Sequence, residues 1–500
     1  MFCALSIRSR PCALPCALAP RDPARRLEPP HTARKARHMD IREAIRTRPM
    51  RPYQIRTIVI CFLLCMVDGF EILIMAFVAP HLSKEWGLGS VEVGYLLSAG
   101  LIGMAVGAFF LSPLSDRIGR RRGTIACLVL VTIGMGLSAA AMNLEQLIVF
   151  RAFAGLGIGG LVASLNILVS ENSNEKRRGV TLGIYGAGLP AGVALGGAIS
   201  GVLISHFGWR SAFVFGTAVT AVLLLVVVRA LPESIEYLVD KRPKNALARY
   251  NAIATKLGYP TADALPEPAA PRGVQGVRGG LFAGLMGRRT ALLWLGYSCL
   301  MAAFYFANTW TPKLLTDVTG DAGTGTTAGV LINVGGVVGA LAFAAMTVVL
   351  RPRLVNTLLM FAGAGVFAAY ASGFEVIALG MVLCICVGMA ANGGVAGFYA
   401  ISPSVYPAAV RATGVGLMIG VGRLVSIVAP ILTGYLLDGG WTPETLYYLF
   451  GAVLVVAGLF MFGLDRTYRG RSENPETPDA PASDDRIAPE HHASSLAERR

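Results

Sequence analysis

Charged residues are scarce in this sequence, and long apolar runs occupy most of its length. Only 15% of the 500 residues are Asp, Glu, Lys or Arg, whereas 54% are hydrophobic. This composition excludes an ordinary soluble globular protein. The apolar runs are about 20 residues long, which suits membrane-spanning helices and exceeds the roughly 10 alternating residues of a barrel strand. The sequence therefore predicts an all-α polytopic membrane protein.

Metal ligands and catalytic motifs are also missing from the apolar runs. The six histidines lie outside these runs, and the nine cysteines have neither the spacing of a disulfide framework nor that of a metal site. The sequence contains no His-Glu-x-x-His, no Gly-x-Ser-x-Gly and no phosphate-binding glycine loop followed by Lys. We therefore expect no metal, no cofactor and no enzymatic activity.

Twelve apolar segments are long enough to span a bilayer, and a long polar segment separates them six and six. The predicted fold class is an all-α membrane protein with twelve transmembrane helices in two six-helix halves. Five parts are expected: an N-terminal extension ending in a short helix (1–54), the first half (55–231), a cytoplasmic linker (232–290), the second half (291–466) and a disordered cytoplasmic tail (467–500). The expected spans are about 55–80, 92–113, 124–142, 145–169, 180–204, 210–231, 291–311, 326–350, 354–373, 375–400, 411–436 and 444–465.

Three smaller expectations concern details of these parts. Residues 1–38 resemble a signal peptide poorly, so we expect disorder there or a translation start at Met39, with a transit peptide as the alternative. Residues 281–289 are expected to form a short interfacial helix. Pairs of small residues four apart predict close helix packing at Gly155/Gly159, Gly192/Gly196 and Gly335/Gly339.

The net charge of +14 indicates orientation in a membrane rather than a nucleic-acid partner. Lys and Arg gather in alternate loops, within 117–122, 176–178, 241–249 and 351–353 and at Arg411. The opposite loops carry only Lys84, Arg210 and Lys313. Because basic loops remain in the cytoplasm, both termini are predicted to be cytoplasmic. We expect a monomeric multi-pass protein in the lipid bilayer of a bacterial-type cytoplasmic (inner) membrane.

Two carboxylates interrupt the first span. Asp68 and Glu71 lie three residues apart, so they share one face of a helix. An ionised Asp at the centre of a membrane helix costs about 2.5–3.5 kcal/mol, so this face must meet protein or a water-filled cavity. A carboxylate in such a place can take up a proton. We favour proton coupling over the alternative of a buried structural pair held by an Arg or by backbone groups.

The loop between the second and third spans reads Ser112-Pro-Leu-Ser-Asp116-Arg117-Ile-Gly119-Arg120-Arg-Arg. It resembles the signature loop of the major facilitator superfamily, Gly-x-Leu-Ala-Asp-Arg-x-Gly-Arg-Arg, with Ser112 in place of the first Gly. Asp116 at a helix end can pair with an Arg or accept hydrogen bonds from a neighbouring helix N-terminus, and so hold one conformation. We therefore assign a conformational latch to this loop. Positive-inside topology alone would explain its arginines, but neither Asp116 nor Gly119.

The fourth span contains a further match to the superfamily. Arg151-Ala-Phe-Ala-Gly-Leu-Gly is similar to its Arg-x-x-x-Gly-x-Gly pattern. Arg151 has three interpretations: it is the latch partner of Asp116, it takes part in proton coupling, or it is an interfacial Arg whose side chain reaches the membrane surface. We include it with the latch residues.

Three segments resemble one family of this superfamily, the aromatic acid:H+ symporters. Asp68-Gly-Phe-Glu71 resembles its Asp-Gly-x-Asp motif, with a longer acid in second place. Leu231-Pro-Glu-Ser resembles its segment after span 6, although sugar porters share Pro-Glu-Ser, and Met39-Asp-Ile-Arg-Glu-Ala-Ile resembles its usual start. The resemblance covers about residues 39–466. It implies alternating-access import of a small aromatic carboxylic acid, of benzoate or hydroxybenzoate type, together with protons.

Arg423 is the first candidate for binding such a carboxylate. It lies twelve residues past Arg411 in span 11, about 18 Å into the membrane at 1.5 Å per residue. A guanidinium binds a carboxylate through two parallel hydrogen bonds, and the resemblance implies the same role. An internal salt bridge to Asp68 or Glu71 is the alternative. Further candidates that could stack or orient an aromatic ring lie in spans 7 and 10, where packing is the alternative role: Tyr297, Phe304, Tyr305, Asn308, Asn392 and Tyr399.

Other functions stay open at this point. The chain could carry another organic anion or a sugar, or act as an efflux pump. A membrane sensor that binds aromatic acids without transporting them is a further alternative, although the tail has no recognisable signalling domain.

Overall fold

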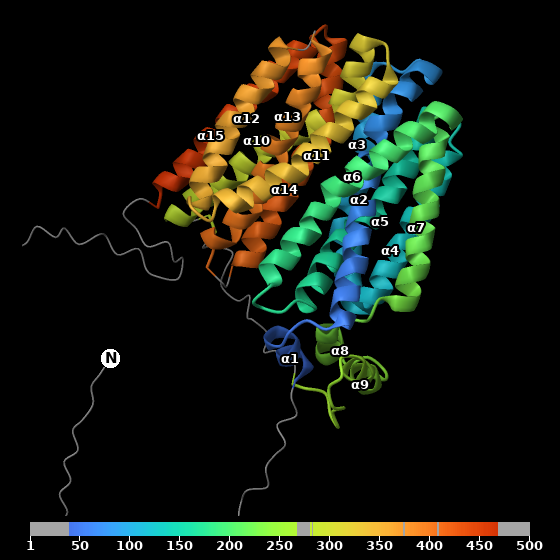
Figure 1. Cartoon of the computed structure of the whole chain (residues 1–500), viewed down its shortest axis with the longest axis vertical. Coiled ribbons are helices and arrows are strands. Elements are labelled where there is room, and N and C mark those ends of the chain that lie inside the picture. The colour runs from blue at the N-terminus through green and yellow to red at the C-terminus, as the bar shows by residue number, and fades with distance from the viewer. Residues whose placement is uncertain (1–39, 268–280, 283, 374–375, 408–409, 469–500) are drawn as a thin grey trace, which may run out of the picture. The chain divides into compact units, whose positions relative to one another are not determined.

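The computed structural model describes residues 40–267, 281–282, 284–373, 376–407 and 410–468. These residues form helices and no strands, and 12 of the helices are long and apolar enough to cross a membrane. The predicted fold class is thus confirmed. The spanning helices are α2 (Pro52–Trp86), α3 (Ser90–Ile118), α4 (Arg120–Ala139), α5 (Leu144–Glu171), α6 (Arg178–Phe207), α7 (Arg210–Ala230), α10 (Gly284–Thr319), α11 (Ala322–Met346), α12 (Pro352–Ser372), α13 (Ile377–Val405), α14 (Arg411–Asp438) and α15 (Pro443–Arg466) (Figure 1).

Local sequence signals set several helix boundaries. Asn143 caps α5, because its side chain accepts a hydrogen bond from the Gln146 backbone at 2.9 Å. Asp321 caps α11 in the same way, and hydrogen bonds from the Thr324 hydroxyl and the backbone lower its pKa. Gly87 ends α2 with a left-handed φ of 65°, a conformation that Gly adopts without strain. Short polar segments therefore separate the apolar runs at defined residues.

Small residues bring neighbouring helices into direct backbone contact. A side chain at Gly155 or Gly159 of α5 would collide with the backbone of α3. Gly192 of α6 meets the backbone of α2 in the same way, and Gly335 and Gly339 of α11 meet that of α13. These positions confirm the predicted packing pairs.

A small cap of three helices has an apolar core of its own (Figure 1). The cap consists of α1 (Ile41–Thr47), α8 (Ile235–Lys241) and α9 (Ala246–Lys256). The Tyr250 hydroxyl accepts a hydrogen bond from the Ile41 backbone at 3.1 Å, and burial raises the pKa of Tyr250 above 10.0. The Glu175 backbone donates to the Arg46 carbonyl at 3.0 Å, which ties the cap to the α5–α6 loop. Its core residues come from all three helices: Ile41, Ala44, Ile45, Leu238, Val239, Tyr250 and Ile253.

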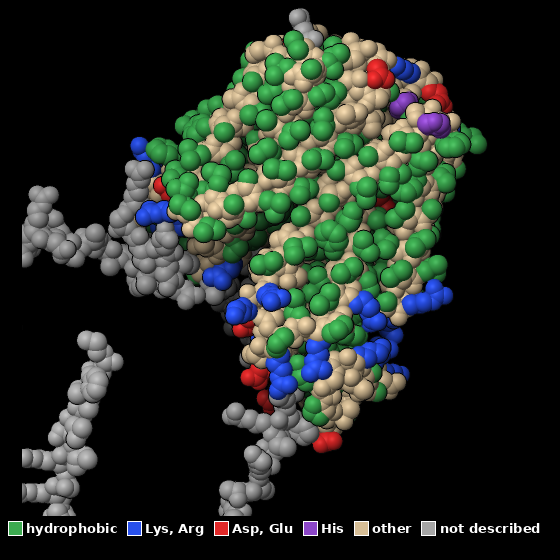
Figure 2. Space-filling view, in the orientation of Figure 1, with side chains coloured by type: hydrophobic (Ala, Val, Ile, Leu, Met, Phe, Trp, Pro, Cys, Tyr) green, Lys and Arg blue, Asp and Glu red, His purple; other side chains and the backbone are tan. Residues whose placement is uncertain are grey.

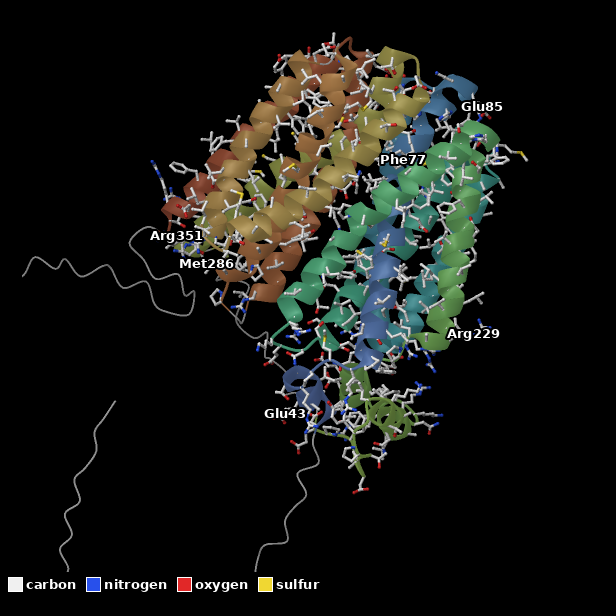
Figure 3. All side chains as sticks on the ribbon, in the orientation of Figure 1. Glu43, Phe77, Glu85, Arg229, Met286 and Arg351 are labelled. Carbon is white, nitrogen blue, oxygen red and sulfur yellow. The ribbon has the colours of Figure 1, made fainter. Side chains whose placement is uncertain are left out.

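The spanning helices form two groups, α2–α7 and α10–α15, which are joined chiefly by α3 with α14, α6 with α11 and α2 with α10. We call the helix ends beside α1 and α8 the cap end and the opposite ends the far end; Figure 3 labels Glu43 and Arg229 at the cap end and Glu85 at the far end. Hydrogen bonds between the groups lie at the far end: Ser90 N to Asp438 Oδ1 (3.2 Å), Tyr95 to Tyr435 between hydroxyls (2.8 Å), and Ser98 Oγ to the Ile427 carbonyl (2.8 Å).

Glycines distinguish the two ends of these helices. Toward the far end, the Phe77 ring of α2 lies against both Gly197 of α6 and Gly329 of α11 (Figure 3). Toward the cap end of α6 and α14, five glycines of these two helices have no neighbouring atom within 4 Å of the place a Cβ would take. The halves are therefore in contact at the far end, and helix faces are open at the cap end. The five open glycines are Gly179, Gly183 and Gly186 of α6 and Gly416 and Gly420 of α14.

The expected interfacial helix at 281–289 is wrong. α10 begins at Gly284 and continues without a break to Thr319, so it joins the seventh span. Arg289 is only 5% exposed because its guanidinium lies 3.8 Å from the Tyr468 ring centre and donates to the Thr467 carbonyl. Packing against the end of α15 thus extends the helix beyond the apolar run.

Candidate transport site

The first buried cluster of charges lies within α2, α5 and α7. Asp68 and Glu71 are 3% and 0% exposed, so neither carboxylate faces lipid. The Thr220 hydroxyl lies 2.9 Å from Glu71 Oε1 and 2.6 Å from the Gly216 carbonyl of its own helix. Asp68 Oδ2 and Glu71 Oε2 are buried without a hydrogen-bond partner among the described residues. Because an ionised oxygen without a partner is costly in such a place, this arrangement favours binding of a proton.

Arg151 of α5 belongs to the same cluster. It is 1% exposed; its Nη2 donates to the Glu71 carbonyl, and its Nη1 lies 3.0 Å from the Met135 sulfur. In the described part of the chain, no direct ion pair joins Arg151 to either carboxylate. The structure thus places Arg151 beside Glu71, and its contacts do not include the latch residue Asp116. Its charge is buried near these carboxylates without being fixed to either.

The latch loop between α3 and α4 contacts other residues. Asp116 lies 3.6 Å from Arg120, whose Nε also lies 3.4 Å from Glu171 at the end of α5. The backbone of Gly119 has a φ of 107°, which residues other than Gly rarely adopt, and a Cβ there would lie 2.7 Å from Glu233. Arg117 is exposed, and its carbonyl accepts a hydrogen bond from Tyr237.

Glu171 and Glu233 join this loop to the segment after α7. The Ser234 hydroxyl donates to Glu171 at 2.6 Å. Glu233 accepts hydrogen bonds from the backbone of Arg121 at 2.9 Å and of Ser234 at 3.1 Å. The latch loop, the end of α5 and the Leu-Pro-Glu-Ser segment therefore form one hydrogen-bonded unit at the cap end. Asp116 stays half free of it, since its side chain is 56% exposed.

The second cluster lies in the other group of helices, around Arg423 of α14. Its Nη1 is buried and has no hydrogen-bond partner among the described residues. Two tyrosines of α10, Tyr297 and Tyr305, are close enough for the Arg423 charge to act on their hydroxyls. The Tyr297 hydroxyl lies 3.2 Å from that of Tyr399 on α13, and Ser426 lies beside Tyr305. A guanidinium with a free N–H group among aromatic rings can bind an aromatic anion.

The remaining candidates contact residues of α10, α11 and α13. Phe304 packs against its neighbour Tyr305, with ring centres 5.2 Å apart. Asn308 donates to the Phe304 carbonyl and accepts from Asn333 of α11 at 3.2 Å. Asn392 donates to the carbonyl one turn before it in α13, and lies against Gly336 of α11. The structure thus brings together Arg423, Tyr297, Tyr305 and Tyr399, and places the amides in helix contacts.

Sequence reasoning missed several partners in these clusters. Thr220 and Ser426 are single hydroxyls in apolar spans, and nothing in the pattern distinguishes them from ordinary helix residues. Glu171 and Glu233 were detectable, since both are acids at the ends of spans otherwise flanked by basic residues. The contact of Gly422 with Tyr297 could not be inferred from the sequence, because it depends on how two distant helices cross.

Among the described residues, twelve helices long and apolar enough to span a membrane form two groups, and each group contains a cluster of charged and polar side chains, an arrangement typical of membrane transporters. The sequence profile of the Major Facilitator Superfamily matches residues 59–430. The chain belongs to this superfamily.

Curated relatives extend along most of the chain. The 4-hydroxybenzoate transporter PcaK of Pseudomonas aeruginosa is 32% identical over 434 residues, which cover 85% of this chain and 96% of the relative. The gallate transporter of Pseudomonas putida is 30% identical and covers 84% and 94% in the same order. The benzoate transport protein of Acinetobacter baylyi is 27% identical and covers 81% and 88%. Within the superfamily, the chain is therefore related to transporters of aromatic acids.

Solved structures support the same fold. The partially occluded inward open form of the xylose transporter XylE from E. coli aligns with a TM-score of 0.63 over 83% of this chain and 98% of that one. Its sequence identity is 14%, so this likeness concerns the fold alone.

Proposed function

We propose that this chain imports a small aromatic carboxylic acid, of benzoate or hydroxybenzoate type, together with protons, by alternating access. It would act as a monomer in a bacterial-type cytoplasmic (inner) membrane, and we propose no nucleic-acid partner. The observation that carries the proposal is Arg423, a half-buried cation beside Tyr297 and Tyr305 whose Nη1 is buried without a hydrogen-bond partner among the described residues. A buried polar group is costly without a partner, and a substrate carboxylate would supply one.

The proposal that the substrate is aromatic rests on the residues around Arg423 and on the names of the relatives. Tyr297, Tyr305 and Tyr399 provide flat apolar surface with hydroxyls at its edge. A benzoate ring fits such a wall when its carboxylate binds Arg423. Relatives that are named for 4-hydroxybenzoate, gallate and benzoate transport favour this class over sugars.

We assign proton coupling to Asp68 and Glu71 of α2. Arg151 of α5 lies beside Glu71. Both carboxylates are buried in the first group of helices, and each has one oxygen without a partner among the described residues. Protonation would remove their charge, and the unfixed Arg151 would then be free to change partners. Arg423, the proposed binding group for the substrate carboxylate, lies in the other group of helices. The proton and the substrate would therefore bind in separate halves.

Access to the site is proposed to be from the cytoplasm in this conformation. Lys and Arg side chains gather at the cap end, and hydrophobic side chains cover the flanks of the helices (Figure 2). Basic loops remain cytoplasmic, so we propose that the cap and both termini lie in the cytoplasm. The hydrogen bonds between the halves lie at the far end, which supports an inward-facing state.

The latch loop would act when the cap end closes. Gly119 and Arg120 hold the loop against Glu233 and Glu171, while the Asp116 carboxylate stays exposed. α3 already pairs with α14 at the far end. Closure of the cap end would bring Asp116 toward the N-terminus of α14, where a carboxylate is stabilised by the helix dipole.

Uptake of radiolabelled 4-hydroxybenzoate and benzoate by cells expressing the protein tests the proposal. We expect accumulation that collapses with a protonophore and that is lost in Asp68→Asn, Glu71→Gln and Arg423→Lys. Glu145→Gln is the matched control, because Glu145 is an exposed carboxylate at the start of α5. Full proton-driven accumulation by both carboxylate variants would refute the coupling role. No uptake of any aromatic acid would refute the substrate class.

A further inference from the structure

Two exposed arginines, Arg122 and Arg229, lie at the cap ends of α4 and α7. These two helices pack against each other and lie side by side at the outer edge of the first group (Figure 1). Figure 3 labels Arg229 at the end of its helix. Neither guanidinium forms an ion pair with a residue that the structure describes. The two charges therefore have no compensation from the described chain.

Arg121 holds the ends of α4 and α7 together. Its Nε donates to the Leu231 carbonyl at 2.9 Å, and its Nη2 donates to the Val228 carbonyl. Arg122 and Arg229 are the next residues along each helix, so both side chains start from backbone that this contact joins. The Glu233 carboxylate beside them already accepts hydrogen bonds from the backbone of Arg121 and Ser234.

The first turn of α4 carries three arginines and no acid. A helix N-terminus has a positive partial charge, so a cation is disfavoured there. The side chain of Arg120 is compensated by Asp116 and Glu171, at 3.6 and 3.4 Å, and that of Arg121 donates to carbonyls. Arg122 has no such partner among the described residues. Its surroundings therefore favour an anion from outside the chain.

Both arginines also end a stripe of exposed apolar residues. Residues three and four apart lie on one face of a helix, and an exposed apolar face of a spanning helix meets the lipid chains. Arg122 begins such a stripe on α4, and Arg229 ends one on α7. A ligand held here would have its charge at the helix ends and its apolar part along the helices. The stripes consist of Ala126, Val129, Ile133 and Leu137 on α4, and Val214, Ala218, Val222 and Leu225 on α7.

We propose that Arg122 and Arg229 bind the headgroup phosphate of one anionic phospholipid, whose acyl chains cover the two stripes. A guanidinium binds a phosphate through parallel hydrogen bonds. The proposed orientation puts these residues at the cytoplasmic leaflet, whose surface is negative, and basic sites between helices on that side bind anionic headgroups. Positive-inside topology explains basic residues at this end. It does not explain why two without partners end neighbouring apolar stripes. The proposal is independent of the transported substrate and of proton coupling.

Native mass spectrometry of the purified full-length protein tests this site. The protein in detergent is titrated with phosphatidylglycerol and, separately, with phosphatidylcholine of the same acyl chains. We expect phosphatidylglycerol to bind more tightly. Arg122→Gln and Arg229→Gln should each weaken its binding at least about fivefold, the contribution of one basic residue at an anionic surface, and leave phosphatidylcholine binding unchanged.

Arg249→Gln is the matched control. Arg249 is equally an exposed arginine, but it lies on α9 of the cap rather than at the end of a lipid-facing stripe. The substitution removes the same charge, so it should leave the affinity for phosphatidylglycerol as in the wild type. Because all three side chains are exposed, the melting temperatures of the variants in phosphatidylcholine should equal that of the wild type.

The double variant distinguishes one shared headgroup from general attraction to a negative surface. If both arginines hold the same phosphate, the loss of either removes most of the binding, and Arg122→Gln/Arg229→Gln should be less than about twofold weaker than either single variant. Independent attraction would instead multiply the two effects, to about 25-fold. That additive result would overturn the shared site.

Three other results would also overturn the proposal. The first is equal affinity of the wild type for the two lipids, and the second is an affinity for phosphatidylglycerol that neither single variant changes or that Arg249→Gln lowers as much. The third concerns a free anion as the ligand. Phosphatidylglycerol should raise the melting temperature of the wild type, whereas inorganic phosphate, which cannot cover the stripes, should not. An equal rise with inorganic phosphate would refute the lipid as the ligand.

Discussion

Replacing Ser98 with Ala should shift the protein from its cap-open toward its cap-closed conformation. Ser98 of α3 is fully buried, and its hydroxyl donates to the Ile427 carbonyl of α14 at 2.8 Å. This bond joins the two halves at the far end, and opening of that end must break it. A buried hydrogen bond contributes about 1 kcal/mol net, so its loss should change the ratio of the two conformations about fivefold.

Spin labels at the cap ends of α6 and α14 measure this ratio. Val180 and Leu417 are exposed there, and their separation shortens when the cap end closes. The labels require a background without accessible cysteines. Ser138→Ala is the matched control, since Ser138 is equally buried but donates within its own helix at 2.7 Å. An unchanged distance distribution in Ser98→Ala, or one identical to that of Ser138→Ala, would refute the far-end contact as a determinant of the equilibrium.

Three further predictions concern the proton cluster, the latch loop and the cap. Thr220→Val removes the hydroxyl shared between the Glu71 carboxylate and the Gly216 carbonyl, a loss of about 1 kcal/mol at Glu71, so proton-driven accumulation should fall about fivefold. Thr217→Val should be near neutral, because the one hydrogen bond of that hydroxyl lies within its own helix. Gly119→Ala forces a φ of 107° on Ala and meets a side chain, so its melting temperature should fall further than that of Gly208→Ala, where φ is 77° and space is open. The raised pKa of Tyr250 means that the folded cap binds the hydroxyl proton more tightly than the unfolded chain does, so the stability of the cap should decrease as pH rises above about 10. The mobility of a spin label on α1 should increase over this pH range, and Tyr250→Phe should abolish the increase.

The helical fold was predictable because the bilayer imposes one strong rule on sequence. Every backbone group in a span must be hydrogen-bonded within its helix, so span length and apolarity suffice to locate it. Small residues four apart also predicted contacts, since Gly155 and Gly159 allow the backbone of α3 to approach. Such properties are local to one helix and depend little on its partners.

The contacts of charged residues were less predictable, because they depend on how distant helices cross. Arg151 fitted three interpretations from sequence, and only the packing of α5 beside α2 puts it next to Glu71. The apolar pattern predicts the start of the seventh span at about 291, whereas α10 begins at Gly284, for a similar reason. Arg289 interrupts the apolar pattern, yet stacking on Tyr468 keeps it inside the helix.

The separation of the two charge clusters limits how coupling can work under the proposed function. Glu71 has its contacts in α5 and α7, and Asp68 lies one turn before it on α2, whereas Arg423 lies beside tyrosines of α10 and its carbonyl bonds to Ser426 of α14. Among the described residues, no ion pair links the two sets. The coupling mechanism therefore does not require the substrate to displace a salt bridge between Arg423 and Asp68 or Glu71. Under the proposed function, each half would neutralise its own charge, with a proton in one and a substrate carboxylate in the other. Under the proposed import, the loaded carrier would exchange its cap-end contacts for the far-end contacts only with both ligands bound, because neither charge is then left uncompensated.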